Sequence, residues 1–232
     1  MMRACALPFL FLCLLLPARA AHGGAPAYGA LKLDIRPPVG FVDATETAAD
    51  LFHATQDEAV PDGLLLRLYL PDDDARHYAE GRPEEVTRQV SLYAARDGES
   101  QAWDRKALEL MARSLESAYE EYAVVPDEAL RDWTALNALL LEAAGKGTPL
   151  LLAPIHGEHA EGRVFMQVFG TDAPAVAPVA ALMATCLVLV NDKVLFVTAS
   201  SLVSSEFPAD DAAWVEASAE AFAEALVSAE KK

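Results

Sequence analysis

The sequence predicts a single α+β domain in which helices flank an antiparallel β-sheet. Four stretches with the composition of β-strands follow one another in the second half of the chain, at residues 149–155, 163–169, 180–190 and 194–202. The last two are separated by the short polar turn Asn191-Asp192-Lys193, which predicts a β-hairpin. The order of strands, two helices, four strands and one helix favours an antiparallel sheet over a βαβ crossover fold. No internal repeat or linker divides residues 31–229, so we expect one domain.

The first twenty residues have the organisation of a secretory signal peptide. Arg3 provides a short positive region, Leu7 to Leu16 form an almost unbroken apolar run, and Ala18-Arg19-Ala20 matches the small-x-small cleavage pattern. An apolar run of about ten residues is too short to cross a hydrocarbon core of roughly 30 Å as a helix. We therefore interpret residues 1–20 as a signal peptide cleaved near Ala20, rather than a buried N-terminal helix, and expect a periplasmic or secreted protein.

Three strands are predicted in the first half of the remaining chain. The Gly- and Ala-rich residues 21–30 are expected to be disordered, and the alternating stretch 31–35 then forms a short strand that ends at Pro37-Pro38. After an irregular acidic stretch, the Leu-dense segment 64–70 predicts a strand covered on both faces. Residues 85–94 are rich in β-forming side chains and predict the third strand.

Three helices are predicted from apolar periodicity and helix-start signals. The first follows Gly98 and ends near Tyr122. Its apolar side chains recur at spacings of three and four, at Trp103, Ala107, Leu110, Met111, Leu115, Ala118 and Tyr122. The second begins at Pro126, because proline and the acids after it suit a first turn, and it ends at Gly145. A closing helix begins at Pro208.

The chain is strongly acidic. Residues 1–20 hold two of the 18 basic residues and no acid, so 16 basic and 35 acidic side chains leave a net charge of −19 on the rest. We expect no nucleic-acid partner, since phosphate binding needs clustered Lys and Arg. The most apolar later segment, residues 179–190, is about a dozen residues long, whereas a membrane span needs roughly twenty. We therefore expect no membrane span in the mature chain.

Cys186 is the single cysteine outside residues 1–20, which excludes an intramolecular disulfide in the mature chain. Its neighbours Ala184, Leu187 and Val188 are apolar, and no basic side chain nearby would activate a thiol. We expect Cys186 to be a buried structural residue.

Known catalytic motifs are missing from the sequence. It contains no Gly-x-Ser-x-Gly, Walker-type loop, Gly-x-Gly-x-x-Gly or Cys-x-x-Cys, and no pair of carboxylates stands out as acid and base. No cofactor is predicted. Four serines at the end of one strand are interpreted as exposed hydroxyls: Ser200, Ser201, Ser204 and Ser205.

Two short polar segments carry metal-ligating residue types. His156, Glu158 and His159 could coordinate zinc or copper in a bent loop, although the spacing of the histidines is not that of a zincin helix. We expect residues 156–159 to be a polar turn between two strands, with the metal site as the alternative. Asp72-Asp73-Asp74 is interpreted as an acidic turn, because the glycine and terminal glutamate of an EF-hand calcium loop are absent. The other histidines that could join a site are His22, His53 and His77.

Four features occur in a characteristic order over nearly all of residues 31–229. They are an early strand ending in Pro37-Pro38-x-Gly40-Phe41, a strand block before Trp103, the Asn191–Lys193 hairpin and a closing helix that contains Trp214. This order resembles that of the Mog1/PsbP-like group, which includes photosystem subunits, a nuclear transport factor and exported bacterial proteins. The resemblance implies helices packed on an antiparallel sheet and a non-catalytic role in binding or assembly. It carries over no functional residue.

The function predicted from these observations is that of a non-catalytic exported binding or accessory protein. Its partner would be another protein or a small ligand, neither of which the sequence identifies. One alternative is a metal-binding protein or metal-dependent hydrolase that uses the turn between His156 and His159. Another is a structural subunit of a larger envelope assembly, which would need an exposed apolar patch.

Overall fold

The structure is a computed structural model that describes residues 28, 36–58, 63–119, 123–146, 150–159, 162–170, 180–203 and 208–230. Side chains are described for most of these residues, but only the backbone is described between residues 143 and 180. The predicted signal peptide and the predicted strand at 31–35 lie outside the described residues.

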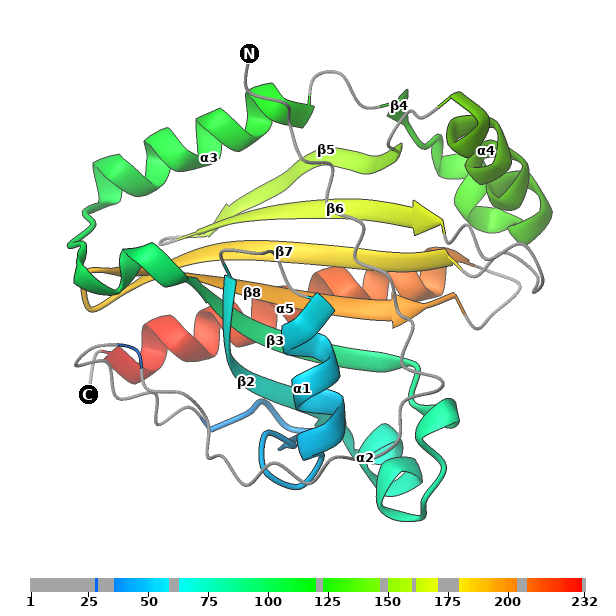
Figure 1. The fold of residues 1–232 in the computed structure, drawn as a ribbon. Helices are drawn as coiled ribbons and strands as arrows, with labels where there is room; N and C mark the ends of the chain where they lie inside the picture. The colour runs from blue at the N-terminus through cyan, green and yellow to red at the C-terminus, as the bar shows by residue number, and fades with distance from the viewer. Residues whose placement is uncertain are drawn as a thin grey trace.

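Eight strands among the described residues form one sheet in the order β1-β2-β3-β8-β7-β6-β5-β4 (Figure 1). They are β1 (Phe41–Asp43), β2 (Gly63–Pro71), β3 (Arg88–Ala95), β4 (Ala123–Val124), β5 (Leu150–His159), β6 (Gly162–Gly170), β7 (Ala180–Val190) and β8 (Lys193–Leu202). Neighbouring strands are antiparallel except for the short β4, which runs parallel to β5. Two antiparallel runs, β1 to β3 and β5 to β8, are joined where β3 pairs with β8. The predicted α+β fold with an antiparallel sheet is confirmed.

The helices in the described part of the chain lie on both faces of this sheet. They are α1 (Ala49–Glu58), α2 (Asp72–Ala79), α3 (Arg105–Tyr119), α4 (Trp133–Lys146) and α5 (Pro208–Glu230), with 3₁₀ helices η1 (Pro83–Glu85), η2 (Arg96–Ser100) and η3 (Asp127–Arg131). Helix α5 runs along one face and packs on β7 and β8, whereas α1 lies on the opposite face over β2 (Figure 1). Helix α3 shares the face of α1, where its Leu108 packs on Leu187 of β7.

Each central strand contributes side chains to two cores, because successive side chains of a strand point to opposite faces. Beneath α5, the paired residues Leu92, Val197 and Cys186 are at most 2% exposed and pack with Phe222 of the helix. On the other face, the side chain of Tyr93 packs in a cluster with α1. Burying a side chain such as Phe222 contributes about 1.5–3 kcal/mol, so α5 is held mainly by its apolar contacts.

Tyr28 is fixed by the fold, although it falls within residues 21–30, which were expected to be disordered. Its side chain is 2% exposed, and its hydroxyl donates a hydrogen bond of 2.7 Å to the backbone oxygen of Ala95. A Cβ atom added at Gly98 would lie 2.6 Å from that hydroxyl oxygen. The absence of a side chain at Gly98 therefore makes room for Tyr28.

The strands and the last helix follow the sequence-based predictions closely, whereas other elements differ. Segments 64–70 and 85–94 correspond to β2 and β3, although Glu85 belongs to η1. The stretch expected to be irregular contains α1. The predicted acidic turn at Asp72–Asp74 is wrong, because these residues form the first turn of α2. Acidic side chains stabilise the N-terminal end of a helix through its dipole, and the prediction of a turn did not take this effect into account.

The two central helices are shorter than predicted. The helix expected after Gly98 begins at Arg105, and residues 96–100 form η2 instead. The helix expected from Pro126 is divided into η3 and α4, which are separated by Asp132. The side-chain carboxylate of Asp132 accepts a hydrogen bond of 2.8 Å from the backbone N–H of Thr134, so it caps α4 and starts a new helix there.

The hairpin between β7 and β8 is confirmed. Asn191 and Asp192 have positive φ angles of 46° and 63°, which a two-residue turn with both central residues in the left-handed region requires. Lys193, predicted as the third turn residue, is the first residue of β8 and pairs with Val190. Asparagine and aspartate tolerate this backbone conformation better than most residues, which explains why the pattern was readable from sequence.

The predicted turn at residues 156–159 is wrong. These residues belong to β5, where His156 is the register partner of Val164 and His159 that of Gly162. The pairing of β5 with β6 is irregular at three places, including the intervals from Ala153 to His156 and from His156 to Glu158. Proline and glycine in a strand often mark such irregularities, so Pro154 and Gly157 indicated bulges rather than the end of the strand.

Candidate functional site: a polar floor on the sheet

Five neutral polar side chains lie together on the face of the sheet that carries α1 and α3. They come from three neighbouring strands: Gln89 and Ser91 from β3, Ser200 and Thr198 from β8, and Thr185 from β7. We call this set the polar floor. In the register of the sheet, Ser91 pairs with Thr198 and Thr198 with Thr185, so these three form a row across the strands.

A second row runs beside the first, where Gln89 pairs with Ser200 and Ser200 with Met183. The exposed fractions are 6% for Gln89, 1% for Ser91, 7% for Thr198 and 4% for Ser200. The polar floor is therefore shielded from bulk solvent. A polar atom in such a buried position needs a hydrogen-bond partner within the protein or a ligand.

The opposite face of the same strands is apolar in the row that lies between the two polar rows. Val90, Ala199 and Ala184 form the row between the two polar rows, and all are at most 1% exposed beneath α5. Packing of a helix on a sheet needs apolar side chains, and this face supplies them.

Two atoms of the polar floor are buried without a hydrogen-bond partner, the Oε1 atom of Gln89 and the Oγ atom of Ser91. By contrast, the hydroxyls of Thr185 and Thr198 are 3.0 Å apart and bond to each other. Leaving a buried polar group unsatisfied costs about 1–3 kcal/mol, so native proteins rarely keep one without a reason. The two polar-floor atoms that lack a hydrogen-bond partner thus both lie on β3, and the hydrogen-bonded threonines lie on the neighbouring strands.

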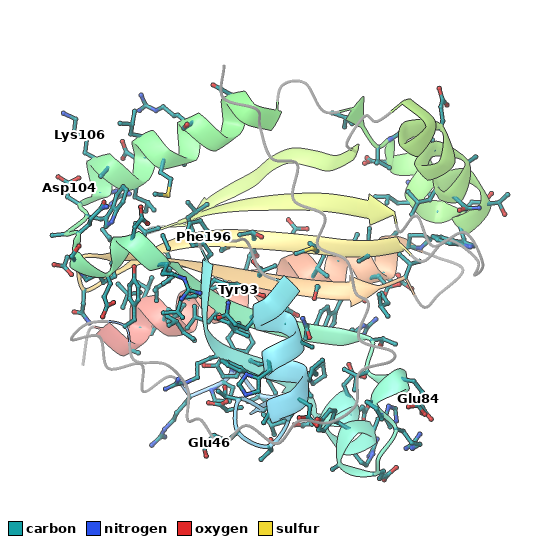
Figure 2. The ribbon with its side chains drawn as sticks, in the orientation of Figure 1. Glu46, Glu84, Tyr93, Asp104, Lys106 and Phe196 are labelled. Carbon is teal, nitrogen blue, oxygen red and sulfur yellow. The ribbon has the colours of Figure 1, made fainter. Side chains whose placement is uncertain are left out.

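An aromatic row borders the polar floor. Tyr93 of β3 pairs with Phe196 of β8, which pairs with Leu187 of β7. Figure 2 labels Tyr93 and Phe196 on neighbouring strands of this face, and Phe196 contacts both the apolar cluster of α1 and that of α3. The face therefore changes from apolar and aromatic to polar over two residues along each strand.

The five side chains of the polar floor include no carboxylate, imidazole, amine or thiol. They can donate and accept hydrogen bonds, and at neutral pH they carry no charge. The chemistry that this arrangement supports is recognition of a neutral polar group by hydrogen bonding.

An ion pair with a buried carboxylate lies on the other face, at the start of α5. The carboxylate of Asp211 is 0% exposed and accepts hydrogen bonds from Arg88 Nη2 at 2.9 Å and from Ser201 Oγ at 3.0 Å. The guanidinium of Arg88 also lies 5.0 Å from the centre of the Trp214 ring. These contacts join β3, β8 and the first turns of α5, so we interpret the cluster as an anchor for the helix.

The serines at the end of β8 were predicted to be exposed, and this is wrong for the two that are described. Ser200 belongs to the polar floor, and Ser201 is 0% exposed and bonded to Asp211. Ser204 and Ser205 lie outside the described residues. The error arose because the last residues of a strand were assumed to reach solvent, whereas β8 is a central strand.

Cys186 is buried as predicted, with an exposed fraction of 0%. Burial, with a smaller contribution from the negative charge of Glu220, raises the pKa of the Cys186 thiol to about 12. The thiol therefore stays protonated at neutral pH and is not a nucleophile.

The three aspartates at the start of α2 do not converge. Asp72 and Asp73 are exposed, whereas Asp74 is buried and accepts hydrogen bonds from the backbone N–H groups of Thr87 and Arg88 at 3.5 and 3.0 Å. Burial raises the pKa of the Asp74 carboxyl group, and the two backbone hydrogen bonds partly oppose this effect. Asp74 thus ties α2 to the start of β3.

The side chains of the predicted metal ligands His156, Glu158 and His159 lie outside the described part of the structure. His22 is also outside it, while His53 is in α1 and His77 in α2. Among the side chains that are described, no group of three or more His, Cys, Asp or Glu residues is arranged to hold a metal ion. The metal site at residues 156–159 therefore stays a prediction.

No helix in the described ranges is both long and apolar enough to cross a membrane. In comparisons with known proteins, no protein-family model, no curated protein and no solved structure matches this chain.

Proposed function

We propose that this chain is a non-catalytic binding or accessory protein, exported from the cytoplasm, and that the buried polar floor contributes to binding. The observation that carries the proposal is the pair of buried oxygens on β3 without hydrogen-bond partners, Gln89 Oε1 and Ser91 Oγ. A ligand that supplies these partners recovers free energy that the unliganded protein gives up. The signal-like residues 1–20 support the expected export.

The neutral chemistry of the polar floor supports binding rather than catalysis. Acid–base or nucleophilic catalysis needs a titratable or activated group at the reacting atom, and the five floor side chains are hydroxyls and one amide. Positioning by neutral hydrogen bonds is typical of a binding site.

The chain offers a matched pair of serines to test this proposal. Ser91 and Ser201 are both buried on central strands, at 1% and 0% exposure, but only Ser201 has hydrogen-bond partners. Ser91→Ala should leave the free energy of unfolding unchanged or raise it by up to about 1 kcal/mol, because it removes an unsatisfied hydroxyl. Ser201→Ala should lower it by about 1–3 kcal/mol, because Asp211 loses a donor. Urea denaturation measures both.

Binding itself is tested by thermal-shift screening of a library of neutral polar small molecules against the native protein and Ser91→Ala. We expect at least one compound to raise the melting temperature of the native protein and to lose most of that effect in Ser91→Ala. A loss of stability above about 1 kcal/mol in Ser91→Ala would assign the hydroxyl a structural role. That result, or a screen in which every shift is the same in both proteins, would contradict the proposal.

A further inference from the structure

We propose that side chains from α1 and from the segment before it close the outer edge of β2, and that this closure prevents a second copy of the chain from pairing there. Strand β2 has nine residues, but β1, its outer neighbour among the described strands, pairs only with Tyr69–Pro71. Along the rest of this edge, no described strand pairs with the backbone N–H and C=O groups. An open edge of this kind is a template for pairing with another chain.

Gln56 of α1 takes the place of a strand at one part of the edge. Its Oε1 atom accepts a hydrogen bond of 2.6 Å from the backbone N–H of Leu65, and its Nε2 atom donates one of 3.3 Å to the backbone oxygen of Gly63. A neighbouring strand would offer the same two groups, an oxygen to the N–H and an N–H to the oxygen. Helix α1 lies over β2 (Figure 1), where its Leu51 and Phe52 pack in one cluster with Leu65, so the amide of Gln56 is held at the edge.

Thr45 closes the part of the edge that lies next to β1. The backbone N–H of Ala44 donates a hydrogen bond of 2.8 Å to the backbone oxygen of Leu68, as it would in a longer strand. The backbone oxygen of Ala44, however, accepts a hydrogen bond of 2.8 Å from the N–H of Ala48 at the start of α1. The hydroxyl oxygen of Thr45 accepts the hydrogen bond of the Leu68 N–H instead, at 3.1 Å. The chain thus leaves the sheet for α1 without leaving that N–H unpaired.

Two arginines satisfy further backbone oxygens of β2. Arg67 Nη1 donates a hydrogen bond of 2.8 Å to the oxygen of Leu66, and Arg96 Nη2 donates one of 3.2 Å to the oxygen of Gly63. Charged side chains at an edge also disfavour pairing between two copies, because like charges would lie opposite each other. The backbone groups of β2 beyond β1 are therefore satisfied by side chains from several segments.

A second copy of the chain is the partner that this edge would take if it were open. Two identical edges placed antiparallel around a twofold axis offer each other matching N–H and C=O groups, and the symmetry closes the assembly at two chains. The stretch beyond β1, Gly63–Leu68, is apolar except for Arg67. Apolar edge strands with little charge are the ones most prone to pair with each other.

The test compares the native chain with two variants. Gln56→Leu keeps a side chain of similar size but removes both hydrogen bonds to β2, and Thr45→Val removes only the acceptor of the Leu68 N–H. The control is Gln101→Leu, which adds an exposed leucine at a residue that contacts Lys193 of β8. Sedimentation velocity over a range of protein concentrations measures self-association. We expect Gln56→Leu to shift toward dimers as its concentration rises, while Gln101→Leu behaves like the native chain.

Hydrogen exchange followed by mass spectrometry locates the contact. At low protein concentration, the amide of Leu65 should exchange about tenfold faster in Gln56→Leu than in the native chain, because it has lost its acceptor. At high concentration its protection should return, because the edge of a second copy supplies a new acceptor. If Gln56→Leu does not fold, Thr45→Val provides the same test at the amide of Leu68.

Three results would overturn the proposal. The first is a folded edge variant that has the same mass as the native chain at every concentration. The second is self-association that leaves the hydrogen exchange of β2 unchanged, which would place the contact elsewhere. The third is equal self-association of Gln101→Leu, which would attribute the effect to an added leucine rather than to the opened edge.

Discussion

Removing the guanidinium of Arg88 should destabilise the protein more than neutralising its partner Asp211. The two members of this ion pair differ in their access to water, because 33% of the Arg88 side chain is exposed and 0% of the Asp211 side chain. A charge that loses its partner is costly in proportion to its isolation from solvent. We therefore expect the two single substitutions to lower the free energy of unfolding by different amounts, although they break the same salt bridge.

The expected magnitudes follow from what each substitution leaves behind. Arg88→Met removes the guanidinium from the buried carboxylate of Asp211 and keeps the hydrogen bond from Ser201, and it should cost about 3–5 kcal/mol. Asp211→Asn keeps the volume and an oxygen that can accept from Ser201, and water reaches the exposed part of Arg88. Its cost should be about 1–2 kcal/mol.

Urea denaturation followed by circular dichroism measures these differences. With a slope of about 2 kcal/mol per molar urea, Arg88→Met should lower the midpoint by about 1.5–2.5 M and Asp211→Asn by about 0.5–1 M. The matched control is Arg76→Met, because the Arg76–Asp73 pair is exposed by 60% and 78% and should contribute less than about 0.5 kcal/mol. Equal losses in the two Arg88–Asp211 variants, or a loss below about 1 kcal/mol in Arg88→Met, would refute the reasoning.

Three further predictions concern other buried groups. Because the folded Cys186 thiol has a pKa of about 12, iodoacetamide at pH 8 should label it only after unfolding, as mass spectrometry would detect; rapid labelling of the native protein would contradict its burial. Burial raises the pKa of Asp74 in the folded state, so this carboxyl should reduce stability as pH rises above about 4, through its folded pKa. Asp74→Asn should not lose stability over this pH range. If the urea midpoints of the two proteins changed equally between pH 4 and 7, the raised pKa of Asp74 would be contradicted. Gly98→Ala should cost about 1–3 kcal/mol, because its methyl group meets the hydroxyl of Tyr28 at 2.6 Å, and Tyr28→Phe should relieve part of that cost in the double variant; an additive loss on thermal denaturation would argue against the clash.

Elements with strong local signals were predictable from sequence. The hairpin at Asn191-Asp192 needs two residues that tolerate positive φ, and α5 begins at a proline followed by two acids within its first turn. Helix α1 was missed because its apolar side chains, such as Leu51 and Phe52, are few and interrupted by polar ones. Its stability comes from packing on β2 rather than from its own sequence, and tertiary contacts of this kind leave little local pattern.

The polar floor could not be predicted because it depends on register between distant segments. The alternation in β3 does place Gln89 and Ser91 on one face and Val90 on the other, which the sequence alone indicates. Nothing in that pattern says that Ser91 faces Thr198, because β3 and β8 are separated by about a hundred residues whose path must be known first. Composition also concealed the site, since scattered Ser and Thr residues are ordinary in any chain.

The place of β8 in the sheet has a consequence for how the chain acquires its structure. The last strand among the described residues, β8, lies between β3 and β7, so β1 to β3 stay unconnected to β5 to β7 until the chain beyond residue 193 is available. Until then, β3 and β7 each present an unpaired edge, which is a template for aggregation. Pairing across such a separation is also slow, because a long loop must close first. We expect a chain that ends at Val190 to aggregate at concentrations where the full chain refolds, which light scattering after dilution from urea would measure; a soluble, folded truncated chain would show that the first seven strands are stable without β8.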